Sequence, residues 1–222
     1  MKKIAVILSA VIISLVLLSC GSGTKGTTGP SGPTGPASIM FRQGSLPTST
    51  FAGAYDTFLY AYSSSTNYGT AASGYAGDAG GAEHMAIQYV INGGYLPSTA
   101  IVSSAYLTMY CSSAGTPGNV IAYSLNEPWL EGSDTWNSLS VAGGSLSASP
   151  ISAAVNVTAP GYYDFKLDNS IVQGWLNGTG SSYGVVLRSQ TESGSQPDVV
   201  FQTKESATVL YRPMLTIYYN LP

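Results

Sequence analysis

The chain of 222 residues has few charged side chains, one histidine and two cysteines. Lys and Arg number 8 and Asp and Glu 11, so charged residues make up 9% of the sequence. That is about a third of the share in ordinary soluble proteins. So little charge excludes a coiled coil, a charged disordered tail and a basic nucleic-acid-binding surface. Because His84 is the only histidine, a histidine-rich metal centre is excluded as well.

The sequence is rich instead in glycine (26 residues), tyrosine (16 residues), serine and threonine. This composition is typical of a secreted, β-rich protein. From Phe51 onward four basic residues stand against all eleven acidic ones, which gives this part a formal net charge of −7. A polyanionic partner is therefore unfavourable unless the basic groups cluster.

The first twenty residues have the form of a bacterial lipoprotein signal peptide. A basic start is followed by an apolar run, residues 4–18, too short to span a membrane, and by Leu17-Leu18-Ser19-Cys20, which resembles a lipobox. We expect residues 1–19 to be removed and Cys20 to be acylated, so that its lipid anchors an exported protein to the outer membrane or cell surface. The alternative is an ordinary signal peptide with an incidental cysteine. Lipidation of Cys20 leaves Cys111 without a disulfide partner, and we expect Cys111 to be buried.

Residues 20–45 are predicted to form the lipidated N-terminus and a linker. Residues 23–37 consist of five Gly-X-Y triplets, three of them beginning Gly-Pro, which is the collagen register. A triple helix of five triplets would need a trimeric domain to hold it, so a stiff polyproline-like spacer is favoured over a trimer. Residues 46–222 are then predicted to form one folded domain.

Short alternating runs separated by Gly, Ser, Asn and Pro predict an all-β fold, a jelly-roll-like β-sandwich of about eight strands. In the last strand, alternation predicts Leu215, Ile217 and Tyr219 on one face and Met214, Thr216 and Tyr218 on the other. The predicted strands cover residues 57–62, 84–91, 103–111, 119–125, 161–167, 183–189, 197–203 and 213–219.

Residues 168–178 have a helical rather than an alternating period. Asp168 or Asn169 can cap the start of a helix here, and Gly178 can end it in a left-handed conformation. This segment predicts one short helix that closes one end of the sandwich. Four apolar residues share one of its faces: Ile171, Val172, Trp175 and Leu176.

The order of short motifs from about residue 51 to 219 resembles a DNRLRE domain. No single motif is specific, but the ordered set covers essentially the whole predicted domain. The resemblance implies a non-catalytic β-sandwich of cell-surface proteins, related to modules that bind acidic polysaccharides such as alginate. The motifs include Asn67-Tyr68-Gly69, Pro128-Trp129-Leu130-Glu131-Gly132, Thr135-Trp136-Asn137, Val172-Gln173-Gly174-Trp175, Tyr183-Gly184-Val185-Val186-Leu187-Arg188 and Arg212-Pro213-Met214-Leu215-Thr216.

One strand departs from the family pattern. Where such domains carry Arg, two apolar residues and a Phe-Asp pair, this chain has Glu83 to Val90 without the arginine or the aspartate. With the net charge of −7, this departure favours a neutral glycan or a protein partner. We therefore carry two hypotheses. One is non-catalytic binding of extracellular polysaccharide, and the other is an adhesive protein that self-associates or binds another surface protein.

Outward-facing aromatic residues are the first candidates for contact with a ligand, because a tyrosine offers a flat apolar ring with a hydroxyl at its rim. If Leu59 points inward, Phe58, Tyr60 and Tyr62 point outward, and the same alternation places Tyr106 and Tyr110 outward. These rings could stack on sugars, or could cover a sheet face or make subunit contacts. We expect the three tryptophans to be part of the core instead: Trp129, Trp136 and Trp175.

The charged candidates are few, and no enzyme activity is expected. Arg188 can fork onto a uronate carboxylate, although an ion pair with Glu205 is the favoured interpretation. Oxygen ligands for a structural calcium ion could come from Asp56, Asp78 and Glu83, without any twelve-residue calcium loop. The acids Glu131 and Asp134 could mimic a glycosidase pair, but they fall in a segment that resembles a non-catalytic family and are interpreted as structural.

Overall fold

The computed structural model describes residues 36–77, 81–91, 94–97, 99–139, 145–179, 183–192 and 197–222. Cys20, most of the Gly-X-Y repeat and Asp78 lie outside these ranges, so the predictions made for them stay predictions. No helix within the described residues has the length and apolar character needed to cross a membrane.

The described part of the chain contains eleven strands and one α-helix, which confirms the predicted all-β class with one short helix. The helix is α1 (Asn169–Asn177), and two short 3-10 turns are η1 (Ala61–Ser63) and η2 (Val209–Tyr211). The strands are β1 (Ala37–Phe41), β2 (Ala54–Tyr60), β3 (Ser73–Gly77), β4 (Glu83–Tyr89), β5 (Ile101–Thr116), β6 (Gly118–Ser124), β7 (Val155–Val157), β8 (Gly161–Leu167), β9 (Val185–Ser189), β10 (Asp198–Gln202) and β11 (Met214–Asn220).

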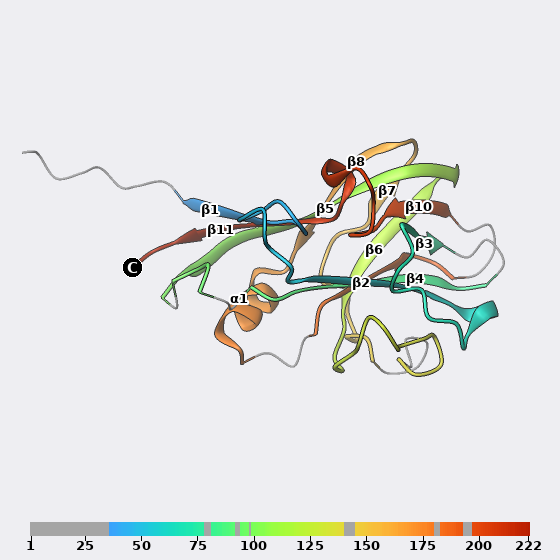
Figure 1. Ribbon diagram of the computed structural model, residues 1–222, viewed down its shortest axis with the longest axis horizontal. Helices are drawn as coiled ribbons and strands as arrows, with labels where there is room; N and C mark the ends of the chain where they lie inside the picture. The colour runs from blue at the N-terminus through green and yellow to red at the C-terminus, as the bar shows by residue number, and fades with distance from the viewer. Residues whose placement is uncertain are drawn as a thin grey trace, which may run out of the picture. The chain divides into compact units, whose positions relative to one another are not determined.

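The strands form one antiparallel sheet that curls into two layers. Their order is β1-β11-β5-β10-β3-β4-β9-β6-β7, with β2 added beside β4 and β8 beside β5. One layer holds β5 with β11 along one edge and β8 along the other, and Figure 1 shows β2 and β4 in the layer below. The layers join where β3 meets β4 through the single pair Gly77 and Glu83. A sandwich-like architecture is therefore built from a continuous, folded-over sheet.

The main core lies between these two layers. Along β5 the inward residues are buried, as alternation predicts, including Cys111. Leu215 and Ile217 on β11 are buried beside them, which confirms the faces predicted for the last strand. The β5 residues that enter the core are Ala105, Leu107, Met109 and Cys111.

A second hydrophobic cluster covers the other face of β2, β4 and β9. Leu59, Ala86 and Val186 from these strands pack there against Leu125, Trp129 and Leu139 of the segment that follows β6. Because both faces of this layer are covered, residues 83–87 of β4 are all buried, whereas a strand with one open face would alternate.

The folded part begins earlier than residue 46. Residues 37–41, which were expected to belong to the linker, form β1 and pair with β11 along their whole length. Phe41 is 0% exposed and its ring lies 5.5 Å from that of Phe51 and 5.8 Å from that of Tyr95. The strands β3 and β7 were also absent from the prediction, because both are short and β3 is built of small residues.

The helix forms where the capping pattern predicted it. The Asp168 carboxylate accepts a hydrogen bond of 2.7 Å from the backbone N–H of Ser170, and Gly178 ends the helix with a left-handed φ of 65°. Val172 and Leu176 are buried, while Trp175 packs partly buried against the main core. The bonds to Ser170 lower the pKa of Asp168, although desolvation opposes them.

Candidate functional site

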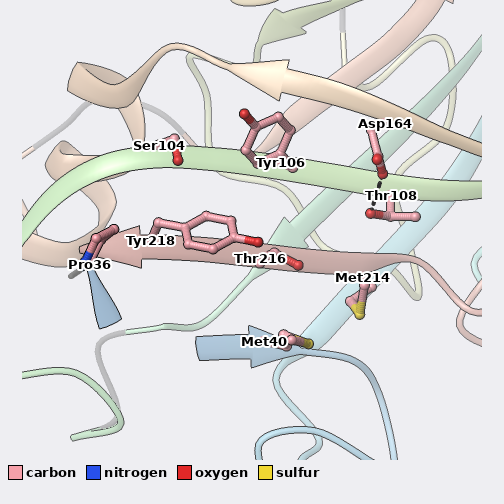
Figure 2. Close-up of a pocket in the computed structure, with 9 residues that line it drawn as sticks. All are labelled: Pro36, Met40, Ser104, Tyr106, Thr108, Asp164, Met214, Thr216 and Tyr218. Carbon is pink, nitrogen blue, oxygen red and sulfur yellow. Dashed lines mark hydrogen bonds between the residues drawn. The ribbon is translucent and has the colours of Figure 1, made fainter. Parts of the chain in front are cut away.

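The outward faces of β1, β11, β5 and β8 form an open groove with a volume of about 470 Å³. This volume lies within the usual range for small-molecule and cofactor sites. Figure 2 shows that the side chains come from four adjacent strands and stand over the sheet. The lining residues are Pro36, Met40, Ser104, Tyr106, Thr108, Asp164, Met214, Thr216 and Tyr218.

The strand register explains why these side chains meet. Directly paired residues lie on the same face of a sheet, and Tyr106 on β5 is paired with Thr216 on β11. One step along, Thr108 is paired with Met214 on one edge of β5 and with Asp164 on the other. The groove is therefore fixed by paired strands. The outward direction predicted for Tyr106 and for the β11 face is confirmed.

Tyrosine rings lie in the groove and also beside it, further along β5. The rings of Tyr106 and Tyr218 lie 6.1 Å apart, edge to face. Beyond Thr108, Tyr110 stacks on Tyr211 with ring centres 3.8 Å apart and planes 6° apart, and Tyr162 meets Tyr110 at 5.0 Å. A hydrogen bond with the Tyr211 hydroxyl, followed by desolvation, raises the pKa of Tyr110 above its ordinary value.

Asp164 is the only ionisable acid or base among the lining residues apart from the two tyrosines. Its carboxylate accepts a hydrogen bond of 2.6 Å from the Thr108 hydroxyl. No salt bridge joins it to any described residue. Lys166 is exposed on the same strand, where it pairs in register with Tyr106. Asp164 therefore places one acidic side chain on the β8 side of the groove, while Arg42 Nη2 lies 3.2 Å from Met214 Sδ on the other side.

The rings of Phe58, Tyr60 and Tyr62 do form the predicted row, with neighbouring ring centres 5.8 Å and 6.0 Å apart, but the row does not lie on an open sheet face. Phe58 is only 5% exposed, with its ring 5.1 Å from those of Tyr68 and Tyr75, so its predicted outward orientation is wrong. Tyr62, at 75% exposure, lies in η1 beyond the end of β2. Alternation around Leu59 gave the wrong answer because both faces of β2 are covered: Leu59 packs in the second hydrophobic cluster, and Phe58 packs on the opposite face among tyrosine rings.

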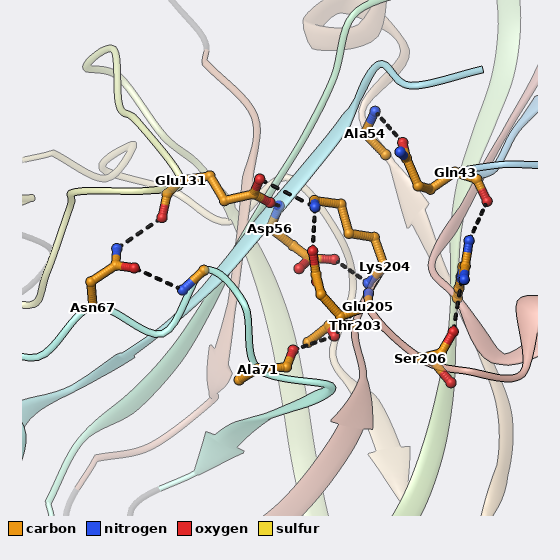
Figure 3. A network of polar contacts seen from close by, with 12 residues as sticks. Gln43, Ala54, Asp56, Asn67, Ala71, Glu131, Thr203, Lys204, Glu205 and Ser206 are labelled. Atoms are coloured by element: carbon orange, nitrogen blue, oxygen red, sulfur yellow. Dashed lines mark hydrogen bonds and ion pairs between the residues drawn. The ribbon is translucent and has the colours of Figure 1, made fainter. Parts of the chain in front are cut away.

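A buried polar network surrounds Asp56, which is 2% exposed (Figure 3). The Asp56 carboxylate accepts a bond of 2.7 Å from the backbone N–H of Lys204, and the Asp56 N–H donates to Glu131 Oε1 at 2.8 Å. The Lys204 ammonium contacts Glu131 Oε2 at 3.2 Å and also contacts Glu205. Burial, followed by the negative charge of Glu205, raises the pKa of Asp56 well above its usual value.

This network gathers a different set of acids from the one predicted for calcium. Oxygen atoms of Asp56, Glu131 and Glu205 all lie within 4.8 Å of one another, and carboxylate oxygens are the ligands that Ca²⁺ prefers. Glu83 instead lies buried on β4, paired in register with Tyr60, and Asp78 is outside the described residues. In the described structure the Lys204 ammonium supplies the positive charge between two of the three carboxylates.

Arg188 forms an ion pair, but with a different acid from the one predicted. Its Nη1 lies 2.9 Å from Glu192 Oε2, and its guanidinium lies 4.5 Å from the centre of the Tyr123 ring. Glu205 pairs with Lys204, so the predicted pair of Arg188 with Glu205 is wrong. The Glu192 carboxylate also contacts His84 Nε2 at 2.5 Å. Burial favours neutral Glu192, yet its bonds to His84 and Arg188 outweigh burial and lower its pKa.

The tryptophans belong to the packed interior, as predicted. Trp129 is buried and its indole N–H donates to the Tyr183 carbonyl at 2.9 Å. Trp136 packs against the second cluster and against the His84 ring, at 4.9 Å between ring centres. None of these rings, nor that of Trp175, lines the groove.

Two sequence patterns associated with hydrolases occur in the chain, an acid pair and a Gly-x-Ser-x-Gly spacing. Asp134 accepts bonds from the Leu130 N–H and the Ser138 hydroxyl, while Glu131 belongs to the Asp56 network, so this acid pair holds loops together. Residues 180–184 also have Gly-x-Ser-x-Gly spacing, which sequence reasoning missed. A nucleophile elbow joins a strand to a following helix, whereas this segment, of which 180–182 are outside the described residues, follows α1 and precedes β9.

Sequence reasoning missed several groove residues. The alternation of residues 161–167 was available and would have placed Tyr162, Asp164 and Lys166 on one face. Met40 was not predicted as a groove residue, because β1 follows directly on the Gly-X-Y repeat and was assigned to the linker. Tyr211 follows no periodic pattern, since it comes from η2.

The chain matches no protein-family model, and a search of curated proteins returns no match. The interpretation of its function therefore depends on the groove and its surroundings.

Proposed function

We propose that this chain is a surface-anchored lipoprotein whose β-sandwich binds an extracellular polysaccharide without cleaving it. The observation that carries the proposal is the groove over β1, β11, β5 and β8, which is lined by Tyr106 and Tyr218 with their rings in edge-to-face contact. The resemblance of the motif order to a DNRLRE domain supports the same reading.

The chemistry of the groove suits a sugar chain. Tyrosine rings present flat apolar faces to the C–H faces of pyranose rings, and their hydroxyls bond to sugar hydroxyls. Ser104, Thr108 and Thr216 add further hydroxyl groups between the rings. Residues two apart on a strand are about 7 Å apart, so the face from Ser104 to Tyr110 extends for about 20 Å along β5. Several consecutive sugar units would fit on that length.

The test is a double substitution in the groove. The exported protein carrying both Tyr106→Ala and Tyr218→Ala should no longer bind to a glycan array. The melting temperature should change little, because both rings are on the solvent side of the sheet. Tyr55→Ala is the matched control, since Tyr55 is an exposed tyrosine on β2, away from the groove. Binding that survives the double substitution would refute the proposal.

Exposed apolar groups near the groove favour self-association as a second candidate function. Tyr162 is 53% exposed and its hydroxyl donates to the carbonyl of Leu210, which is itself exposed. Together with Met40 and Tyr218 they place several apolar groups on the outward side of one layer. Light scattering would decide between the two. If the parent binds no glycan but associates, and the double substitution stops association, the adhesive function replaces the first.

A further inference from the structure

We infer that Asp164 makes the groove selective for glycans that carry protonated amines, such as polymers of glucosamine, over polyuronates. This inference rests on the proposed function and names the class of glycan that it would favour. The starting observation is that Asp164 supplies the one formal charge among the lining residues.

The carboxylate of Asp164 is held in place and remains available. The Thr108 hydroxyl donates to Oδ1 at 2.6 Å and fixes the side chain over the groove, as Figure 2 shows. Neither oxygen has a salt-bridge partner in the part of the chain that the structure describes. A ligand can therefore reach the second oxygen without breaking an existing ion pair.

The neighbours of Asp164 suit a cation. Tyr162 precedes it by two residues on β8, and Tyr106 and Tyr110 flank its partner Thr108 on β5. Aromatic faces attract ammonium groups, and a carboxylate beside them adds an ion pair. A sugar amine between Asp164 and these rings would gain both contacts, whereas a uronate carboxylate would meet repulsion.

The basic side chains that a uronate would need are mostly engaged elsewhere. Arg188 is paired with Glu192, and Lys204 lies among Glu131 and Glu205. Arg212 donates to the backbone carbonyls of Ser206 and Gln43. Two basic side chains remain near the groove: Arg42, whose Nη2 donates to Met214 Sδ at 3.2 Å, and Lys166 on the groove face. From Ala37 onward five basic residues stand against eleven acidic ones, and this net charge of −6 outweighs both.

Four β-1,4-linked hexasaccharides would test the inference by titration calorimetry in a mildly acidic buffer. They are those of glucosamine, N-acetylglucosamine, glucose and mannuronate. The parent protein should bind the glucosamine hexamer about fivefold more tightly than the acetylated one, as expected for one exposed ion pair at about 4 Å. Mannuronate should bind most weakly, and added salt should reduce the preference for glucosamine.

The variant Asp164→Asn should bind the glucosamine and N-acetylglucosamine hexamers with equal affinity and still bind the neutral ones. Asp198→Asn is the control, since it removes the same charge at the start of β10 and should keep the parent's preference. An unchanged preference in Asp164→Asn, or a parent that favours mannuronate, would overturn the inference while leaving glycan binding established. If no hexamer binds the parent, the proposed function fails and this inference fails with it.

Discussion

Asp56 is a buried carboxylate with other acidic side chains beside it, and this environment changes its pKa. Two further carboxylates and one ammonium group lie around it, so the network carries more negative than positive charge. A buried charge is tolerated when hydrogen bonds satisfy it, and here the backbone N–H of Lys204 does so. The raised pKa of Asp56 means that protonation is easier in the folded state than in the unfolded chain.

This raised pKa predicts an effect of pH on stability. Between the unfolded value of 3.8 and the higher folded value, the folded protein binds more protons than the unfolded chain. The contribution of Asp56 to stability is therefore fully present below 3.8 and is lost as pH rises through the folded pKa. Asp56→Asn should remove that part of the pH dependence, as measured by urea unfolding from acidic to neutral pH. An unfolding free energy with the same pH profile as the parent would contradict this, and Asp198→Asn serves as the control at a half-buried carboxylate outside the network.

At the residue scale, the sequence predicted whether a side chain points inward or outward only on strands that have one face open to solvent. Tyr106 and Tyr110 follow simple alternation, because β5 has the core on one side and solvent on the other. Phe58 does not, because β2 is covered on both faces. The partners of Arg188 and Asp56 could not be predicted, since Glu192, Glu131 and Lys204 reach them only through the tertiary fold.

At the level of elements, β1 closes one side of the sheet and also helps build the groove. Met40 lines the groove while its neighbour Phe41 enters the core, so one strand serves both surfaces. The helix α1 was predictable because its caps are local in sequence. The strand β1 was not, because nothing local reveals its pairing with β11, in which Phe41 pairs with Leu215 and Ala37 with Tyr219.

The alternation along β1 predicts opposite outcomes for neighbouring substitutions. Phe41→Ala should lower the free energy of unfolding by about 3–5 kcal/mol, because it removes a fully buried ring. Met40→Ala, one residue away on the solvent side, should change it by about 0.5 kcal/mol or less. Chemical denaturation of both variants measures the difference. Equal effects would mean that β1 is not packed against the core as described.

At the scale of the whole molecule, the predicted leader and linker would display the groove away from a membrane. If Cys20 is acylated, Cys20→Ser should move the protein from the membrane fraction to the soluble exported fraction. Mass spectrometry of the parent should find acyl chains on an N-terminal Cys20. An unmodified terminus at another residue would contradict the lipoprotein prediction without affecting the argument for the groove.

The curled path of the sheet is the part of the molecule-scale fold that sequence did not predict. The alternating runs and the turn residues between them predicted the all-β fold class and the positions of most strands. The joining of β10 to both β5 and β3, and of β3 to β4, depends on contacts between distant segments. The groove depends on the same long-range register, which brings β1, β11, β5 and β8 together.

The edge of β2 has a consequence for molecules crowded side by side on a surface. An unpaired strand edge is a template on which another chain can add a strand and start aggregation. Here the backbone N–H groups of Ala54 and Asp56 donate to the side chains of Gln43 and Glu131, at 3.3 Å and 2.8 Å. A strand from a neighbouring molecule would have to displace both side chains before it could pair. The Gln43 and Glu131 side chains thus protect this edge of β2 from edge-to-edge aggregation.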